Sequence, residues 1–301
     1  MAYQMCFATF AILTALALYL GLRGADERMA MMAALAYLAF PLCLMEFVLG
    51  MQDDAVTMLL FLLPLVLLHR GRGLSAGVVS LTGVLTKMFN VLLVPWMVLR
   101  AEARQRTGLL IGCLGLGLAL LLPLLILFPD QLPSFRYYLL GDPDFPTGGA
   151  SISPWHYLGR LGYGLPGWTG AVLTVGGVVG ATLLAYRRGM SLWRGATLVV
   201  LAFFLCYPKV LMVYFVMPSA LLLMWGLEDR RVMSRLLAMI VPLLLSVALT
   251  GKGMDPIADE AWVWLSGMAL SMLGWGLMLQ AWFLTRGRAV FFERSDGEAQ
   301  R

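Results

Sequence analysis

Long apolar runs separated by short polar or basic turns follow one another along the chain, and they constrain its fold more than any other feature. The runs of about twenty residues are 4–22, 29–49, 106–128, 167–186, 232–250 and 261–284. A transmembrane helix needs about 20 apolar residues to cross the hydrocarbon core of a bilayer. Shorter runs lie at 55–68, 195–207 and 210–226. Short helices are tolerated in a membrane when they are tilted or shielded by neighbours.

The amino-acid composition supports a membrane protein. Hydrophobic residues make up 60% of the chain and charged residues 13%, whereas soluble domains carry about 25% charged residues. We therefore predict an all-α, polytopic integral membrane protein of the cell (inner or plasma) membrane. Residues 1–286 form one transmembrane helical domain with an outer loop at 129–166 inserted, and residues 287–301 form a cytoplasmic tail. The four cysteines lie inside apolar runs without metal-type spacing, which predicts a packing role.

The net charge of +5 comes largely from arginines grouped in the short turns between apolar runs. Such clusters are typical of cytoplasmic loops, and they do not indicate nucleic acid as a partner. Residues 74–98 have basic turns on both sides. If this segment enters the membrane and returns as a re-entrant pair of short helices, 17 of the 22 Lys and Arg lie on one side. If the segment crossed the membrane once, only 8 Lys and Arg would lie on the cytoplasmic side and 13 on the outer side. The positive-inside rule therefore favours the re-entrant path.

Three charged residues stand at or inside apolar segments: in this topology Asp53 and Asp54 lie on the outer side, and Lys87 lies within the membrane. Asp53 and Asp54 open a short apolar run, and Lys87 lies in the middle of 74–98. A charged side chain at membrane depth is costly and marks a candidate functional site. Structural alternatives exist for all three. Paired carboxylates at a helix start interact favourably with the helix dipole, and Lys87 has snorkelling or pairing with Glu46 as its alternatives.

The longest connection of the chain, residues 129–166, also lies on the outer side. It is rich in aromatic residues, glycine and proline, and it contains Arg136, His156 and Arg160. Connections of this length are usually functional or disordered. The aromatic residues favour a folded cap at the membrane interface, where Tyr and Trp are enriched. His156 follows Trp155, and packing within the loop is its structural alternative.

Three segments of the chain carry motifs. They read GMQDDAVTMLLFLL at 50–63, HRGRGLSAGVVSLTGVLTKMFNVLLVPWMVL at 69–99 and YPKVLMVYFVMPSALLLMW at 207–225. Together they resemble the core of GT-C glycosyltransferases, in the bacterial and archaeal branch related to mannosyltransferases. In that branch a G-Q-x-D-type turn precedes a short helix, an R-G-R-type cytoplasmic turn and a Gly-rich segment ending in a lysine. Later, a basic residue and a tyrosine precede a Pro-containing helix. The resemblance covers roughly residues 30–226.

The resemblance implies a GT-C-like helical bundle with glycosyltransferase activity. The enzyme would transfer a hexose, with mannose as the candidate sugar, from a polyprenyl-phosphate donor to a glycan or lipid acceptor on the extracytoplasmic face. GT-C enzymes begin with a helix and a large outer loop carrying an acidic motif, which this topology lacks. A truncated start, a missing part on a partner membrane subunit and a non-catalytic role remain open. A transporter or flippase of lipid-linked or anionic substrates is the other alternative, although no inverted repeat is evident.

The implied chemistry assigns roles to the charged residues. Transfer from a lipid-phosphate sugar needs a carboxylate to deprotonate the acceptor hydroxyl, and a cation or metal to stabilise the leaving phosphate. Asp53 or Asp54 is the candidate catalytic base, and both are alternatively oxygen ligands of a divalent metal. An interfacial anchor is the structural alternative for Lys209. The substrate-binding candidates are Lys87, Lys209, Arg136, Arg160, His156 and Tyr214.

Overall fold

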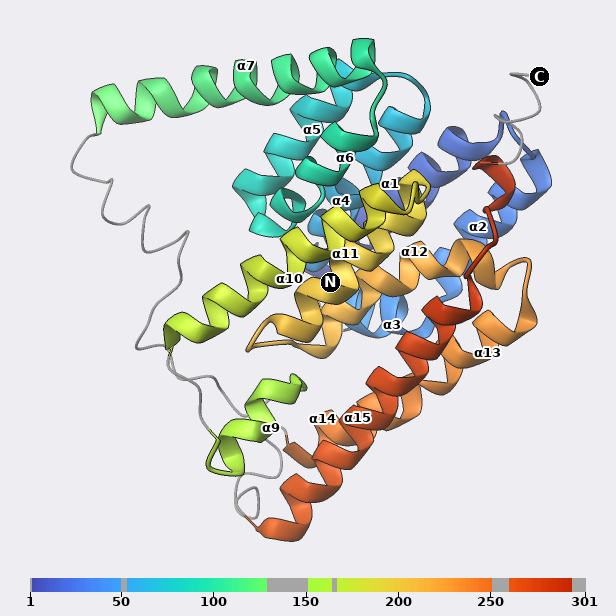
Figure 1. The fold of residues 1–301 in the computed structure, drawn as a ribbon. Coiled ribbons are helices and arrows are strands. Elements are labelled where there is room, and N and C mark those ends of the chain that lie inside the picture. The colour runs from blue at the N-terminus through green and yellow to red at the C-terminus, as the bar shows by residue number, and fades with distance from the viewer. Residues whose placement is uncertain (1, 50–52, 129–150, 164–166, 251–259, 294–301) are drawn as a thin grey trace.

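The computed structural model describes residues 2–49, 53–128, 151–163, 167–250 and 260–293, and its regular elements are all helices (Figure 1). They are α1 (Ala2–Leu22), α2 (Glu27–Ala39), α3 (Pro41–Cys43), a π-helix (Leu44–Leu49), α4 (Asp54–His69), α5 (Gly73–Thr86), a 3₁₀ helix (Met88–Leu92), α6 (Val94–Arg100), α7 (Ala103–Leu127), α9 (Pro154–Arg160), α10 (Gly167–Arg187), α11 (Leu192–Cys206), a 3₁₀ helix (Met212–Phe215), α12 (Val216–Gly226), α13 (Arg230–Ala238), α14 (Ile240–Thr250) and α15 (Ala261–Leu284). This confirms the predicted all-α protein.

Several of these helices match the apolar runs expected to cross a membrane. Within the described ranges, five stretches are long and apolar enough to do so: Ala2–Leu22, Ala103–Leu127, Trp168–Arg187, Arg230–Leu249 and Ala261–Leu284. The shorter runs form α4, α11 and α12. The chain is therefore a polytopic membrane protein in which long and short helices are combined.

Two apolar runs that read as single helices in the sequence are interrupted. Residues 29–49 form part of α2, then α3 and the π-helix, because Phe40 adopts an extended backbone (φ −65°, ψ 124°) immediately before Pro41. A proline ring disfavours helical geometry at the residue that precedes it. The expectation of one spanning helix over 29–49 was therefore wrong. Residues 232–250 are divided at Met239 between α13 and α14, which still form one apolar stretch.

Helices α5 and α7 pack backbone against backbone and set the path of the segment between them. Gly73 lies against Gln105 and Gly77 against Leu109, an approach that glycine permits because it has no Cβ. Both contacts advance by four residues in the same direction, so the two helices run parallel and begin at the same end of the molecule. Residues 74–98 therefore leave this end through α5 and return to it through α6, which agrees with the predicted re-entrant path.

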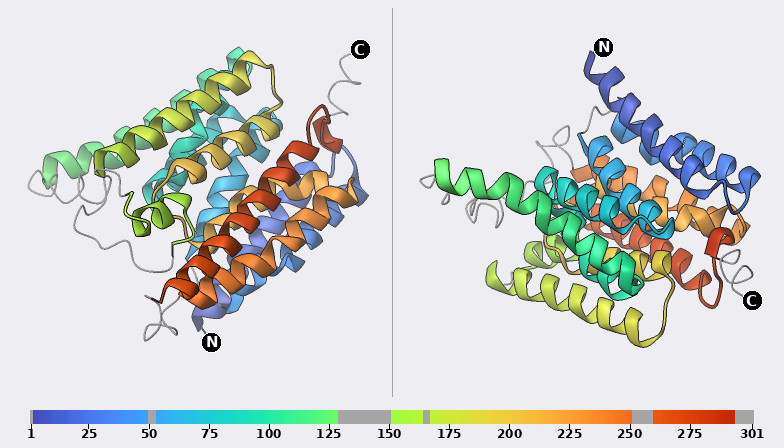
Figure 2. Two further views of the ribbon diagram at one scale, coloured as in Figure 1. Left: turned by 60° about the horizontal axis from the view of Figure 1, so that its bottom comes forward. Right: turned by 90° about the horizontal axis from the view of Figure 1, so that it is seen from above.

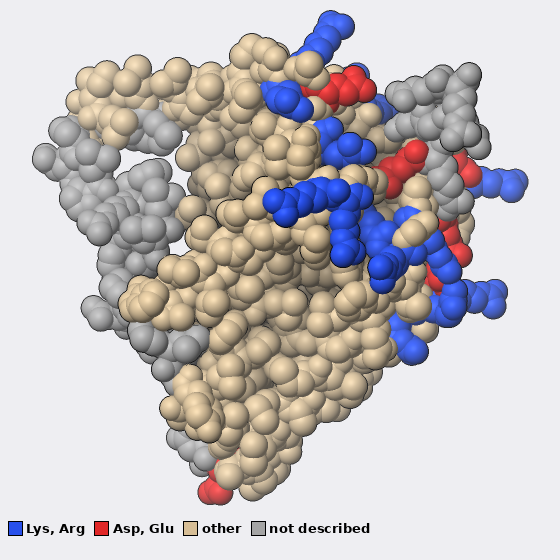
Figure 3. Space-filling model, viewed as in Figure 1, with Lys and Arg blue, Asp and Glu red and all other residues tan. Residues whose placement is uncertain are grey.

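The arginine-rich turns lie together at one end of the bundle. Figure 3 shows Lys and Arg side chains gathered over one part of the surface, beside a broad area without charges. Hydrogen bonds join these turns: Arg70 Nε to Gly21 O (3.0 Å), Trp96 Nε1 to Leu192 O (2.7 Å), Trp193 N to Glu293 Oε1 (3.3 Å) and Trp225 Nε1 to Arg288 O (3.1 Å). We call this the basic end, and it comprises the turns after α1, α4, α6, α10, α12 and α15.

Burial separates a central helix from peripheral ones. All eleven residues of α12 are buried, and Trp96 on α6 and Trp193 on α11 are fully buried as well. By contrast, α7 extends beyond the rest of the bundle (Figures 1 and 2), with Leu114, Leu118 and Leu122 exposed. A large exposed apolar face is unusual in a soluble monomer, whereas it is the surface that a helix presents to lipid. The periphery of the bundle is thus suited to a bilayer.

Candidate functional site

Asp53, Asp54 and Lys87 meet at the end of the bundle opposite to the basic end. Helix α4 begins at Asp54, and Lys87 directly follows α5. The Lys87 ammonium donates to Oδ1 of Asp54 at 2.7 Å and to Oδ1 of Asp53 at 3.0 Å. In the part of the chain that the structure describes, Lys87 is the one cation paired with either aspartate. We call these three residues the carboxylate–lysine cluster.

The members of the carboxylate–lysine cluster differ in exposure. The side chain of Asp54 is 4% exposed, that of Lys87 is 28% exposed and that of Asp53 is 69% exposed. A buried carboxylate needs a charged partner because its desolvation is costly, and Lys87 is that partner for Asp54. Asp53 keeps a carboxylate that a substrate can approach from outside.

Helix capping does not account for the position of Asp53. This residue occupies the N-cap position of α4, yet its side chain makes no capping hydrogen bond. The favourable interaction of both carboxylates with the helix dipole remains. Their hydrogen bonds, however, go to a lysine that lies 34 and 33 residues further along the chain. The aspartate pair therefore makes a tertiary contact as well as a local one.

A buried asparagine holds the turn that presents Lys87. Helix α5 ends where the Lys87 backbone N–H donates to Gly83 O at 2.9 Å, and the backbone of Lys87 is extended. Asn90 Nδ2 then donates to Leu60 O, on α4, at 2.5 Å. Gly83 leaves room for the Asn90 amide, because a Cβ at this position would overlap with it. These contacts fix the turn against α4 and bring Lys87 to the aspartates.

A divalent metal bridging the two aspartates does not fit this arrangement. The Oδ1 atoms of Asp53 and Asp54 both contact the Lys87 ammonium, which takes the position of a bridging cation. Among the described residues, no group of three or more His, Cys, Asp and Glu side chains is arranged to hold a metal ion.

Five aromatic side chains pack beside the carboxylate–lysine cluster, and we call them the aromatic cluster: Phe89, Phe203, Phe204, Tyr207 and Tyr214. Phe89 contacts Tyr214 edge to face, with ring centroids 4.9 Å apart. Tyr214 stacks on Phe204 at 5.8 Å, and Tyr207 stacks on Phe203 at 4.9 Å. Tyr214 lies within electrostatic reach of the carboxylate–lysine cluster. Half-buried tyrosines offer both an apolar ring and a hydroxyl group to a ligand.

His156 and Arg160 lie on α9, which is fixed against the segment that contains Lys209. The hydrogen bonds that fix it are Ile152 N to Val210 O (2.8 Å), Ser153 Oγ to Tyr207 O (2.9 Å) and Trp155 Nε1 to Leu205 O (2.7 Å). Burial, and then the nearby charge of Arg160, lower the pKa of His156. Its ring also contacts Tyr157 edge to face. This environment agrees with a packing role for His156.

Phe89 and Tyr207 are residues of this site that sequence reasoning misses. Each lies two residues away from a lysine of the motifs, Phe89 after Lys87 and Tyr207 before Lys209. That proximity is the available signal, because nothing in the local pattern shows that the two rings belong to one cluster. Arg136, by contrast, lies outside the described residues, and its predicted role stays a prediction.

A helical membrane protein with short embedded helices and a carboxylate–lysine site opposite its arginine-rich turns has the features expected of a GT-C type glycosyltransferase. The chain belongs to glycosyltransferase family 87, a GT-C type family that matches residues 1–208. Membership confirms the predicted GT-C resemblance and implies a membrane glycosyltransferase with a lipid-linked sugar donor. The matched region includes the carboxylate–lysine cluster and ends before Lys209. Searches of curated proteins and of solved structures found no match.

Proposed function

We propose that this protein transfers a hexose, with mannose as the candidate sugar, from a polyprenyl-phosphate donor to a glycan or lipid acceptor. The reaction takes place at the carboxylate–lysine cluster. The positive-inside rule assigns the basic end to the cytoplasm, so the cluster faces the extracytoplasmic side of the inner or plasma membrane. The observation that carries the proposal is the accessible carboxylate of Asp53, held beside a lysine at this end.

Asp53 is the proposed general base. Its carboxylate accepts the proton of the acceptor hydroxyl while the hydroxyl oxygen attacks the anomeric carbon of the sugar. The bond between the anomeric carbon and the phosphate oxygen breaks, and its electron pair leaves with polyprenyl phosphate. Asp54 is buried against Lys87, so it acts through the lysine as a positioning residue.

The leaving phosphate needs more positive charge than the cluster alone provides. Two carboxylates share a single ammonium, so the carboxylate–lysine cluster carries a net negative charge. Lys209 and Arg160 are the additional cations that we assign to the phosphate, beside Lys87. Arg160 is exposed at the end of α9, and α9 is bonded to the segment of Lys209. Tyr207 and Tyr214 are the side chains that we assign to contact with the sugar.

Asp53→Asn tests the role of the base. The variant should lower hexose transfer about 10²–10⁴-fold, the usual effect of losing a positioned base. Its thermal stability should stay near that of the wild type, because the Asp53 side chain is 69% exposed. The matched control is Glu260→Gln, which neutralises an exposed carboxylate that precedes α15 and makes no capping hydrogen bond.

The assay follows labelled mannose from polyprenyl-phosphate mannose into lipid and glycan acceptors, with the purified full-length chain and with membranes. Transfer by Asp53→Asn at the wild-type rate would exclude this residue as the base. Transfer that appears only with a second membrane protein would favour the non-catalytic subunit. Movement of the intact lipid-linked sugar from one leaflet of a vesicle membrane to the other, without hexose transfer, would favour a flippase.

A further inference from the structure

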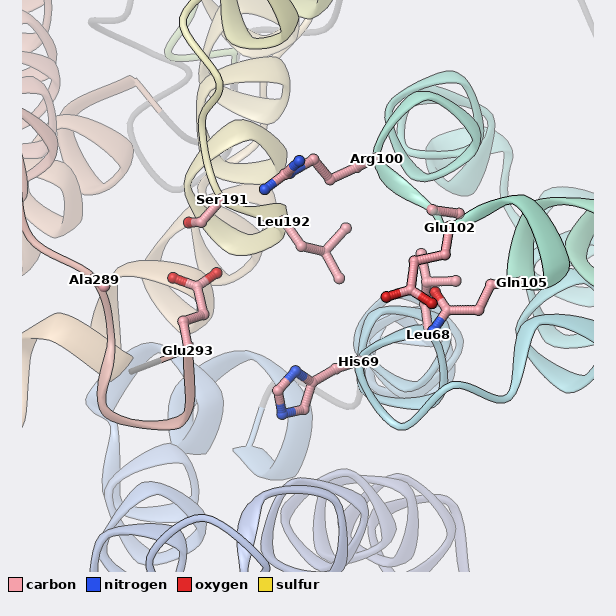
Figure 4. A pocket seen from close by; sticks show the side chains of 10 residues that line it. Leu68, His69, Arg100, Glu102, Gln105, Ser191, Leu192, Ala289 and Glu293 are labelled. Atoms are coloured by element: carbon pink, nitrogen blue, oxygen red, sulfur yellow. The ribbon is translucent and has the colours of Figure 1, made fainter. Parts of the chain in front are cut away.

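A second polar pocket opens at the basic end, far from the proposed reaction site. It has a volume of about 410 Å³ and lies where the ends of several helices meet (Figure 4). The polar residues that line it are His69, Arg100, Glu102, Gln105, Ser191 and Glu293. His69 is the last residue of α4 and Asp54 is the first. At a rise of 1.5 Å per residue, about 22 Å separates the pocket from the carboxylate–lysine cluster.

Arg100 and Glu293 bring opposite charges to this pocket without pairing with each other. Figure 4 shows the two side chains entering from different walls, with His69 on a third side and Glu102 and Gln105 opposite Glu293. Within the described part of the chain, the Arg100 guanidinium makes no hydrogen bond or ion pair, and Glu293 makes no ion pair. The charge of Arg100 acts on Glu293 from a distance, but neither group is held in a direct ion pair, so each can contact a ligand.

Glu293 has a buried oxygen without a hydrogen-bond partner, whereas Arg100 is exposed. Glu293 Oε1 accepts a hydrogen bond from the backbone N–H of Trp193 at 3.3 Å, whereas Oε2 is buried without a hydrogen-bond partner. Burial is the main cause that raises the pKa of Glu293, and the hydrogen bond from Trp193 and the charge of Arg100 oppose it. A buried acceptor without a partner is unfavourable. A ligand that brings a charged donor to this carboxylate would remove that penalty.

We propose that the pocket binds a headgroup in which a primary ammonium lies a few atoms from a phosphate, as in ethanolamine phospholipids. The phosphate lies at Arg100, whose planar guanidinium offers a fork of donors to oxyanions, and Gln105 is a further donor. The ammonium lies at Glu293 and Glu102. Both carboxylates disfavour a simple anion and Arg100 disfavours a simple cation, so a zwitterion is the ligand that matches the whole lining.

The position of the pocket favours the lipid over a free zwitterion. The pocket lies among the arginine-rich turns where the helices end, which is the depth of phospholipid headgroups in a bilayer. Its volume of about 410 Å³ is within the range of small-ligand sites. The side chain of Arg100 is exposed, so a lipid headgroup has direct access to it. This site is independent of the proposed transfer reaction.

Titration of the purified full-length protein with lipids tests the proposal. Phosphatidylethanolamine, phosphatidylcholine and phosphatidylglycerol with identical acyl chains are compared by native mass spectrometry and by the thermal midpoint. Phosphatidylethanolamine should bind about tenfold more tightly than the other two, because choline has no N–H donor and glycerol has no charge. Glycerophosphoethanolamine, which has no acyl chains, is the arm that represents the free zwitterion.

Variants of the two charges make the test specific. Arg100→Gln should weaken the binding of all three lipids about tenfold, because they share the phosphate, whereas Glu293→Gln should reduce the preference for phosphatidylethanolamine about tenfold. The control is Arg104→Gln, which removes an exposed arginine at the same end that does not line the pocket. If Glu293→Gln does not fold, the exposed Arg100 variant still decides. Equal binding of the three lipids, or lipid affinity unchanged in Arg100→Gln, would overturn the proposal. Glycerophosphoethanolamine binding as tightly as the lipid would support the pocket but make the free zwitterion its ligand.

Discussion

Asp53 and Asp54 show how adjacent, chemically identical residues acquire different roles. Neighbouring positions on a helix point about 100° apart, so the first turn of α4 directs one carboxylate inwards and the other outwards. The side chain of Asp54 is 4% exposed and that of Asp53 is 69% exposed. In the proposed reaction a substrate hydroxyl reaches Asp53 directly, while Asp54 pairs with Lys87. The division of roles follows from burial and not from residue type.

The dependence of Asp54 on Lys87 gives a stability prediction. Lys87→Met leaves a buried carboxylate without its partner, so the variant should unfold more readily by about 1–3 kcal/mol. Adding Asp54→Asn removes the unpaired charge and should restore part of this loss. Thermal midpoints of the two variants in the same detergent provide the measurement. A double variant that is no more stable than Lys87→Met alone would show that Asp54 is satisfied in another way.

Lys209 gives a prediction about the donor. A charge-assisted contact with phosphate contributes roughly 1.5–3 kcal/mol, so Lys209→Met should weaken donor affinity by about one to two decades. Lys209→Arg should retain part of the affinity because it keeps the charge but changes the geometry. Donor titration of the purified variants separates this role from interfacial anchoring. Unchanged donor affinity in folded Lys209→Met would exclude the phosphate role.

At the scale of secondary-structure elements, the packing of α5 against α7 determines where the carboxylate–lysine cluster is built. Helix α5 ends directly before Lys87, and its glycines allow the backbone of α7 to approach. The 3₁₀ helix after Lys87 is bonded to α4 through Asn90. Helices α7 and α4 thus both help to position Lys87: α7 packs against α5, and α4 carries the aspartates that Lys87 contacts.

Gly77→Val tests this packing. A Cβ at Gly77 would overlap with the backbone carbonyl of Leu109 on α7, so the two helices must separate. Forcing additional atoms into a packed interface costs about 1–3 kcal/mol, and the displaced α5 should also lower hexose transfer by moving Lys87. The control is Gly115→Ala on α7, where a Cβ meets no neighbouring atom within 4 Å. Wild-type stability and transfer in Gly77→Val would show that the interface adapts without moving the site.

At the scale of the whole molecule, two ends with different chemistry define the protein. The basic end collects the arginine-rich turns and the pocket lined by Arg100 and Glu293. The opposite end holds the carboxylate–lysine cluster and the aromatic cluster. Between them lies a bundle whose outer surface is apolar along α7 and α10. This arrangement places the proposed transfer reaction and the proposed headgroup site at opposite ends of the bundle.

The re-entrant path predicts which positions share a side of the membrane. Cysteines introduced at Arg72 and Arg104, in a background without the native cysteines, should both be labelled from the cytoplasmic side by a membrane-impermeant reagent. Both positions flank residues 74–98, and the contact of Gly73 with Gln105 brings these flanks together. A cysteine at Glu260 is the control, because it precedes α15 and should be labelled from the other side. Labelling of positions 72 and 104 from opposite sides would contradict the topology.

Much of the fold could be predicted from the sequence, because a long apolar run has few ways to satisfy its backbone in lipid other than as a helix. The runs at 4–22 and 261–284 became α1 and α15. The distribution of arginines also indicated the re-entrant path. The positive-inside rule uses only the charges in the turns between helices, and these can be read from the sequence. The break at Phe40 is invisible to hydropathy, because it comes from the local backbone geometry that Pro41 imposes on the residue before it.

The candidate site depended on the tertiary structure. The sequence marked Asp53, Asp54 and Lys87 as charges in apolar surroundings, but it left the partner of the lysine open. Their contact spans 33 and 34 residues and requires α4 and α5 to be antiparallel. The aromatic cluster and the pocket of Arg100 and Glu293 join still more distant segments. Local sequence patterns indicate how each segment prefers to fold. Contacts between distant segments follow from how the helices pack, and this packing decided which charged residues form a site.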